Sequence, residues 1–195
     1  MNFESFFTER NEVPSNLVLL AREMPDRCQT IAELDRPIVL TQEMRLELPE
    51  MSPDTRERLE RLGVPKEVLD AIGSEAEAKI YENANLKPAE VNGKDALIRT
   101  DIDYDQKDAM GTTNLERMQS GRAPLDANGK PIELHHIGQK QDSPLAELTS
   151  VEHRGNGNDN VLHNKQKESE INREDFDKER KDYWKARAEQ IENQR

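Results

Sequence analysis

Four histidines gathered in one short stretch constrain this chain more than any other feature of its sequence. His135, His136, His153 and His163 are the only histidines among the 195 residues. Neutral imidazole is a common ligand for divalent transition metals, and a side-chain pKa of about 6.5 also suits a general base. The cluster therefore predicts a site that binds a metal, moves a proton, or does both.

The sequence around the first two histidines predicts a pair of short strands. Residues 132–137 have the pattern of a strand, and residues 145–149 have the pattern of a second one. Successive side chains of a strand point to opposite faces, so His135 and His136 are expected on opposite sides. One of them can then ligate a metal while the other reaches a water molecule beside it.

The other two histidines follow a helix start signal. Thr149 and Glu152 form a T-x-x-E capping box, which predicts a helix that carries His153 in its first turn. The glycine- and asparagine-rich stretch 155–160 interrupts that helix, and ordered structure resumes before His163. The predicted order is therefore a strand that ends in His135 and His136, a loop, a second strand, a helix with His153, and then His163.

The remainder of the chain reads as short elements divided by proline and glycine. Ser52 is a predicted N-cap with Pro53 at the first helical position, and Gly63 is expected to stop that helix. Further helices are expected over residues 16–24, 28–34, 65–83, 114–120 and 164–195. Further strands are expected over residues 37–40, 44–48 and 96–100, and the strand that carries His135 and His136 can equally be placed at residues 131–136.

Composition and charge exclude several classes of protein. Lys and Arg number 28 against 40 Asp and Glu, for a net charge of −12, which would repel a polyanion at long range and excludes a general DNA coat protein. The single Cys28 excludes a disulfide framework. We expect a soluble chain with no membrane partner, since its N-terminus lacks the features of a cleaved leader and its apolar runs are short.

Six segments together resemble a known family. They are ELHHIGQ at 133–139, PLAELT at 144–149, EHRG at 152–155, VLH at 161–163, NLERM at 114–118 and GRAP at 121–124. In combination they resemble the LHH branch of the HNH/endonuclease VII superfamily. That family is known for ββα-metal nuclease domains at the C-termini of bacterial polymorphic toxins, which cognate immunity proteins neutralise.

The resemblance implies a role for each histidine and a fold for the chain. His135 resembles the first metal ligand and His136 the general base that activates water, while His153 and His163 resemble the residues that complete the metal site or contact the scissile phosphate. The implied cofactor is a divalent ion such as Mg²⁺, Mn²⁺, Zn²⁺ or Ni²⁺. The expected fold is α+β: a mostly helical region over residues 1–95 of unknown role, then an LHH nuclease domain over residues 96–195 with a long C-terminal helix.

One residue of the HNH pattern has no clear counterpart. The middle Asn of that pattern orients the general base, and Gln139 or Glu147 is a candidate to replace it. Residues that could contact phosphate, with surface solubility as the alternative explanation for each, are Arg117, Arg122, Lys140 and Arg154.

The expected function is that of a metal-dependent DNA endonuclease. The resemblance implies an antibacterial toxin or effector used in interbacterial competition, which acts in the cytoplasm of a target bacterium. Its expected partners are DNA, a cognate immunity protein and delivery machinery. Two alternatives stay open: a non-catalytic interaction module stabilised by metal, and an RNase toxin on the same scaffold. Aromatic residues make up only 4% of the chain, and a scarcity of stacking platforms favours DNA over RNA.

Overall fold

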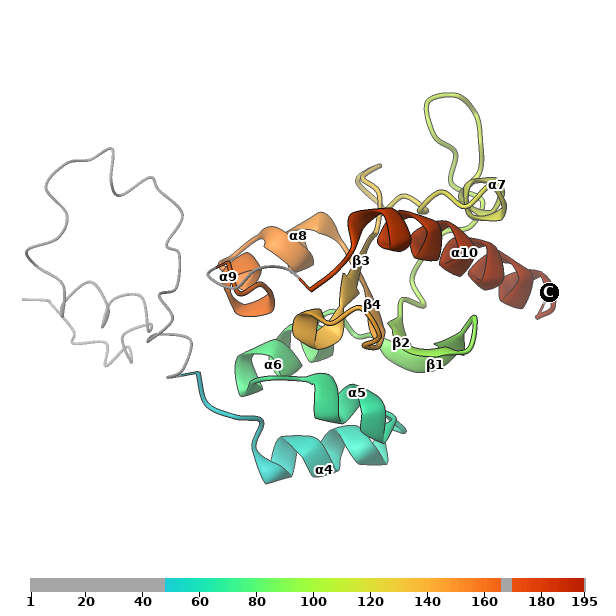
Figure 1. Cartoon of the computed structure of the whole chain (residues 1–195). Helices are drawn as coiled ribbons and strands as arrows, with labels where there is room; N and C mark the ends of the chain where they lie inside the picture. Colours follow the sequence, from blue (N-terminus) through green and yellow to red (C-terminus); the bar gives the residue numbers. More distant parts are fainter. Residues whose placement is uncertain (1–47, 166–169, 195) are drawn as a thin grey trace, which may run out of the picture. The chain divides into compact units, whose positions relative to one another are not determined.

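The computed structural model describes residues 48–165 and 170–194 (Figure 1). All of them belong to the compact unit formed by residues 38–195. The elements expected over residues 16–24, 28–34 and 37–40 lie outside the described residues, as does the strand expected over 44–48 except for its last residue. Within the part of the chain that is described, no helix has the length and apolar character needed to cross a membrane.

Helix α4 (Pro53–Arg61) begins as the sequence predicts. Ser52 is its N-cap and accepts a hydrogen bond from the amide of Thr55, and Pro53 occupies the first helical position. Gly63 follows the C-cap with φ at +82°, a conformation that glycine adopts without strain. The predicted start and stop of this helix are confirmed.

The single helix predicted over residues 65–83 is wrong, because the chain forms two helices there. These are α5 (Lys66–Ala71) and α6 (Glu75–Asn83). Ile72 leaves the helical conformation with ψ at 116°, and Ser74 starts α6 as a new N-cap by accepting from the amide of Glu77. The apolar i, i+4 spacing continues across this break, so spacing alone did not indicate it.

A four-stranded mixed sheet forms the centre of the fold. Its order is β1-β2-β4-β3, with a parallel β2–β4 pair between two antiparallel pairs. Asn92 and Gly93, both with positive φ, form the β1–β2 turn. The boundary predicted after residue 95 falls inside β2. The strands are β1 (Lys87–Val91), β2 (Lys94–Ile98), β3 (Glu133–His136) and β4 (Leu145–Leu148).

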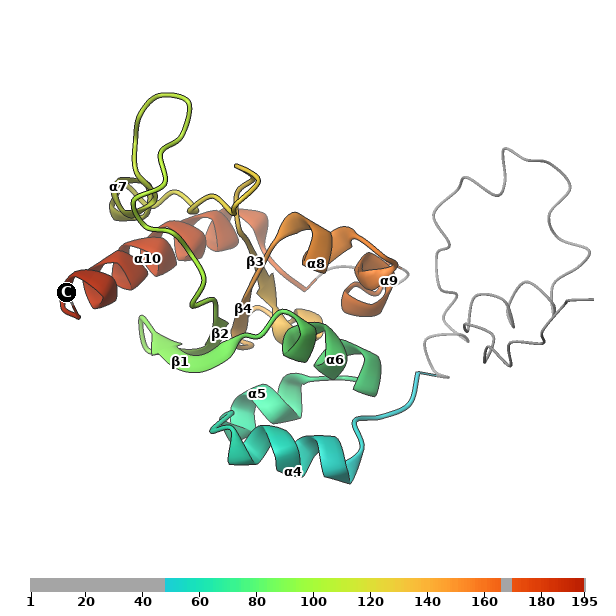
Figure 2. The same ribbon diagram turned by 180° about the vertical axis from the view of Figure 1, so that it is seen from behind.

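Helices cover both faces of this sheet (Figure 1, Figure 2). On one face Leu97, Ala146 and Leu148 pack with the apolar side chains of α4, α5 and α6. On the other face Ala96 and Leu145 pack with α7 (Asn114–Gln119) and with the long helix α10 (Arg173–Glu192). The alternation of side chains along the strands therefore builds two separate apolar cores.

The C-terminal helix starts later than the sequence suggested. Its N-cap is Asn172, whose side chain accepts from the amides of Glu174 and Asp175, so the predicted start at residue 164 is wrong. A polar cap of this kind satisfies amides that have no partner inside the helix. Short elements connect β3 to this helix: η1 (Ile137–Gln139), α8 (Ser150–Arg154) and α9 (Asn158–Leu162).

A buried carboxylate attaches α10 to the sheet. Glu147 of β4 is completely buried. Its side chain accepts hydrogen bonds from the Tyr183 hydroxyl at 2.8 Å, from Arg187 Nε at 2.9 Å and from the backbone amide of Arg99 at 2.8 Å. Two strands and the helix are thereby fixed relative to one another around a single side chain.

Candidate metal centre and active site

Three histidines from three different elements converge at one point. His135 lies on β3, His153 lies on α8, and His163 is the C-cap of α9. His153 Nε2 lies 3.2 Å from His135 Nδ1 and 3.2 Å from His163 Nε2. The capping box of Thr149 and Glu152 is present as predicted and sets the start of the helix that carries His153. One possible ligand atom from each histidine lies within 4.8 Å of the others.

Two carboxylates hold the outer sides of these rings. His153 Nδ1 lies 2.5 Å from Glu133 Oε2, and His163 Nδ1 lies 2.9 Å from Asp159 Oδ1. A carboxylate accepts hydrogen bonds, so each Nδ1 carries the proton in the neutral ring and each Nε2 presents a lone pair. Imidazoles that ligate metals commonly have such a carboxylate behind them.

The inward nitrogens fit a divalent cation. Lone pairs of two neutral imidazoles face each other at 3.2 Å, an arrangement that a cation between them would relieve. Tetrahedral coordination with bonds of about 2.0–2.1 Å separates ligand nitrogens by about 3.3 Å, close to the distances found here. Within the described part of the chain, His135 Nε2 is also buried without a hydrogen-bond partner. This donor set is therefore suited to a metal ion.

Burial favours the neutral form in which imidazole binds metals. The pKa of His135 is lowered well below its usual value, first by burial and then by the neighbouring imidazoles of His153, His163 and His136. Burial is also the main cause that lowers the pKa of His153, and the hydrogen bond to Glu133 only partly opposes it. Fewer protons then compete with a cation for these nitrogens.

His136 faces the other side of β3, as the strand pattern predicted. Its side chain is fully buried, and its Nε2 lies 2.9 Å from Glu179 Oε2 on α10. The ring of Phe176, also on α10, lies against it with centroids 4.6 Å apart. His136 Nδ1 is buried and has no hydrogen-bond partner among the residues that the structure describes. The pair of adjacent histidines is thus divided between the three-histidine cluster and the C-terminal helix.

Glu179 is a site residue that the sequence analysis missed. It lies 43 positions after His136 in a helix with many charged residues. Its second oxygen accepts from Lys94 Nζ at the start of β2. Nothing in local spacing connects these three residues, because only the packing of α10 on the sheet brings them together.

The two candidates for orienting His136 are engaged elsewhere. Gln139 Oε1 accepts from the backbone amide of Asn164 at 2.8 Å, and Glu147 belongs to the buried network with Tyr183 and Arg187. Neither hydrogen-bonds to His136 within the described residues. The carboxylate in contact with His136 is that of Glu179 instead.

All four histidines line one open cavity of about 600 Å³ between β3, α8 and the first half of α10. Basic side chains outnumber the two acidic ones in its lining. A local excess of positive charge in a chain with a net charge of −12 marks this cavity as the part of the described surface suited to an anion. The basic lining residues are Arg117, Arg122, Arg154, Arg180 and Lys181, and the acidic ones are Glu133 and Asp177.

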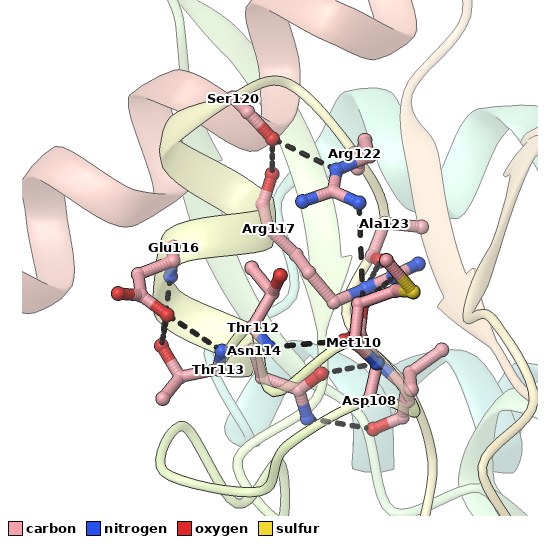
Figure 3. A network of polar contacts seen from close by, with 11 residues as sticks. Asp108, Met110, Thr112, Thr113, Asn114, Glu116, Arg117, Ser120, Arg122 and Ala123 are labelled. Atoms are coloured by element: carbon pink, nitrogen blue, oxygen red, sulfur yellow. Dashed lines mark hydrogen bonds and ion pairs between the residues drawn. The ribbon is translucent and has the colours of Figure 1, made fainter.

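Three of the four predicted phosphate contacts line this cavity. Arg117 and Arg122 are held beside α7, where Asp108 accepts from Arg117 Nη1 at 2.8 Å and lies 3.9 Å from Arg122 Nη1 (Figure 3). Arg154 donates to Glu133 Oε2 at 2.9 Å and keeps 66% of its side chain exposed. Lys140 is not among the described residues that line the cavity.

A comparison with protein families identifies part of the chain. Residues 113–190 match the family model LHH, described as a nuclease of the HNH/ENDO VII superfamily with conserved LHH. The matched segment runs from α7 to α10 and contains Leu134, His135 and His136 in that order, together with the other two histidines and Glu179. No solved structure matches the chain.

Proposed function

We propose that this chain, whose residues 113–190 match the LHH family of HNH/ENDO VII nucleases, is a metal-dependent endonuclease that hydrolyses DNA. The observation that carries the proposal is the shared cavity. A three-histidine centre suited to a cation and a separate histidine with an unpartnered nitrogen both line it. Hydrolysis of a phosphodiester needs both functions close to the same phosphate.

Each histidine has a distinct part in the proposed chemistry. A divalent ion held by His135, His153 and His163 would stabilise the negative charge that develops on the phosphate oxygens. Glu133 and Asp159 accept from Nδ1 of His153 and His163, so in the neutral rings the inward Nε2 atoms keep their lone pairs. We assign His136 as the general base, with Nδ1 as the ring nitrogen that Glu179 leaves without a hydrogen-bond partner. This nitrogen is buried, so the attacking water has to reach it from the cavity that His136 lines.

The basic lining of the cavity supports an anionic substrate. Arg154 and Arg180 are exposed side chains at the cavity, and we assign them to contacts with the phosphates on either side of the scissile bond. Arg117 and Arg122 stand further back beside Asp108. The small number of aromatic residues favours DNA over RNA, since recognition of single-stranded RNA relies on stacking.

The biological role that we propose is that of an antibacterial effector. The likeness to polymorphic-toxin nucleases supports it, as does the nuclease family of residues 113–190. In this role delivery machinery carries the chain into a target bacterium, where it cleaves DNA. A cognate immunity protein protects the producing cell.

The alternative, a module in which the metal only stabilises the fold, accounts less well for the ligand count. Structural zinc sites have four protein ligands, whereas catalytic sites have three and keep a position open. The group found among the described residues contains three histidines. His136 contacts Glu179 and does not belong to that group.

A plasmid-nicking assay with a series of divalent metals tests the proposal. We expect the protein to nick plasmid with at least one metal, chelation to abolish nicking, and His136→Ala to reduce the rate by about 100-fold or more. Glu189→Gln changes an exposed carboxylate on α10 and serves as the control variant. Nicking that survives both chelation and His136→Ala would refute the mechanism, and cleavage of RNA but not of plasmid would refute the assigned substrate.

A further inference from the structure

The contact between α10 and His136 has a consequence for how the proposed base works. We propose that Glu179, held in place by Lys94, is a positioning residue that keeps the neutral ring of His136 in the Nε2–H tautomer and so places the lone pair of the proposed base on Nδ1. This inference rests on the proposed function in treating His136 as the base. The contacts on which it stands belong to the described structure itself.

Two side chains one helical turn apart on α10 hold the ring of His136. Phe176 lies against the ring at 4.6 Å between centroids, and Glu179 Oε2 lies 2.9 Å from Nε2. The guanidinium of Arg180 lies 5.1 Å from the centre of Phe176. Because the His136 side chain is fully buried, these neighbours and not water set its orientation. The ring is therefore fixed in both position and rotation.

The hydrogen bond to Glu179 selects one tautomer. A neutral imidazole has one N–H donor and one lone pair, whereas an ionised carboxylate only accepts. Burial would raise the pKa of Glu179, but hydrogen bonds with His136 and Lys94 outweigh it and the pKa lies below its usual value. Nε2 must then carry the proton, which leaves the lone pair on Nδ1.

Lys94 determines which atom of side chain 179 can face His136. Its Nζ donates both to Glu179 Oε1 and to the backbone carbonyl of Gln141, the latter at 3.2 Å. An ammonium group has donors only, so the atom of residue 179 that faces Lys94 must be an acceptor. Lys94 comes before the segment that matches the family, so the positioning of His136 draws on β2, β3 and α10.

This arrangement makes Glu179→Gln an informative substitution, because it changes the bonding and keeps the shape. The oxygen of the new amide side chain should face Lys94, so the amide nitrogen faces His136 and donates to Nε2. His136 would then adopt the Nδ1–H tautomer, which has no lone pair for the proton of water. Removing the lysine charge in Lys94→Met/Glu179→Gln frees the amide to turn its oxygen toward Nε2 and restore the original tautomer.

The experiment reads the tautomer directly and independently of catalysis. Ring ¹⁵N spectra of the metal-free protein report which nitrogen of His136 carries a proton. The His136→Ala variant identifies the signals by their absence. We expect Nε2–H in the wild type, Nδ1–H in Glu179→Gln, and Nε2–H recovered at least in part in the double variant. Glu189→Gln should match the wild type.

Kinetics on the metal-loaded protein supply the second measurement. Glu179→Gln should lower kcat about 100-fold with KM and metal affinity nearly unchanged, and the double variant should recover at least about tenfold of that loss. A tautomer that stays Nε2–H in Glu179→Gln would overturn the positioning role even if nuclease activity is present. A switched tautomer in a protein that cleaves no nucleic acid would refute the proposed function and leave the positioning of His136 by Glu179 standing.

Discussion

Replacement of Glu147 by Gln should destabilise the fold strongly. The substitution keeps the size of the side chain, so it opens no cavity and isolates the loss of charge. Arg187, whose side chain is only 5% exposed, would then be a buried cation without its counterion. Tyr183 and the amide of Arg99 would compete for the single remaining acceptor oxygen.

The expected loss in the free energy of unfolding follows from these contacts. Removing one partner of a buried, hydrogen-bonded ion pair costs about 3–5 kcal/mol. For a chain of this size, each kcal/mol corresponds to about 2–4 °C in Tm, so a decrease of roughly 10 °C is expected. The control is Glu57→Gln, which removes the same charge from an exposed ion pair with Arg61 and should cost less than about 1 kcal/mol.

Urea unfolding followed by tryptophan fluorescence measures this difference. Trp184 is the only tryptophan and is 1% exposed, packed beside Tyr183, so its emission reports whether α10 is docked on the sheet. Both variants are compared with the wild type in the presence of a chelator, which removes any contribution from bound metal. A loss below about 1 kcal/mol for Glu147→Gln, equal to that of the control, would refute the argument from the buried charge.

Two further predictions concern a close backbone contact and the support of a ligand. Gly138→Ala should lower the free energy of unfolding by roughly 2–4 kcal/mol, because φ is +77° and the new Cβ would meet the Ala71 carbonyl oxygen at 2.7 Å. Gly129 also has positive φ but has open space around it, so Gly129→Ala should cost only about 1 kcal/mol. Thermal unfolding measures both losses, and equal losses would contradict the steric argument. Glu133→Gln should weaken metal binding about 10- to 100-fold by calorimetry, since His153 loses its carboxylate, and unchanged affinity would contradict that support.

Much of the three-histidine cluster could be predicted because its information is local. The capping box at Thr149 fixes where α8 begins, and the alternation of a strand separates His135 from His136. Both signals act over a few residues, where chain geometry leaves few choices. The outward carboxylates Glu133 and Asp159 were not identified, although each lies close in sequence to a histidine.

Other parts of the fold depended on local signals that the prediction did not use. Asn92 and Gly93 form the dipeptide typical of a two-residue hairpin turn, yet β1 was not predicted. The apolar spacing over residues 65–83 suggested one helix, while Ser74 supplies the N-cap that divides it. In each case one or two turn or cap residues determined where an element begins or ends.

Contacts between distant segments could not be predicted from one sequence. Glu179 and Lys94 reach His136 only because α10 docks across the sheet. The charge pattern of α10 is that of a solvated helix, and it gives no sign of which glutamate turns inward. The inward glutamate follows from the burial of Tyr183 and Trp184 on the same helix, which orients its face toward β4.

The parallel pairing of β2 with β4 affects how this protein can be divided. The segment that matches the family begins at residue 113, after β2, so an excised 113–190 fragment would expose the edge of β4 that Ala96 and Leu97 normally cover. Unpaired strand edges recruit other chains, and the fragment should therefore associate with itself. The start of the family match at residue 113 thus divides the four-stranded sheet, because β1 and β2 lie before it.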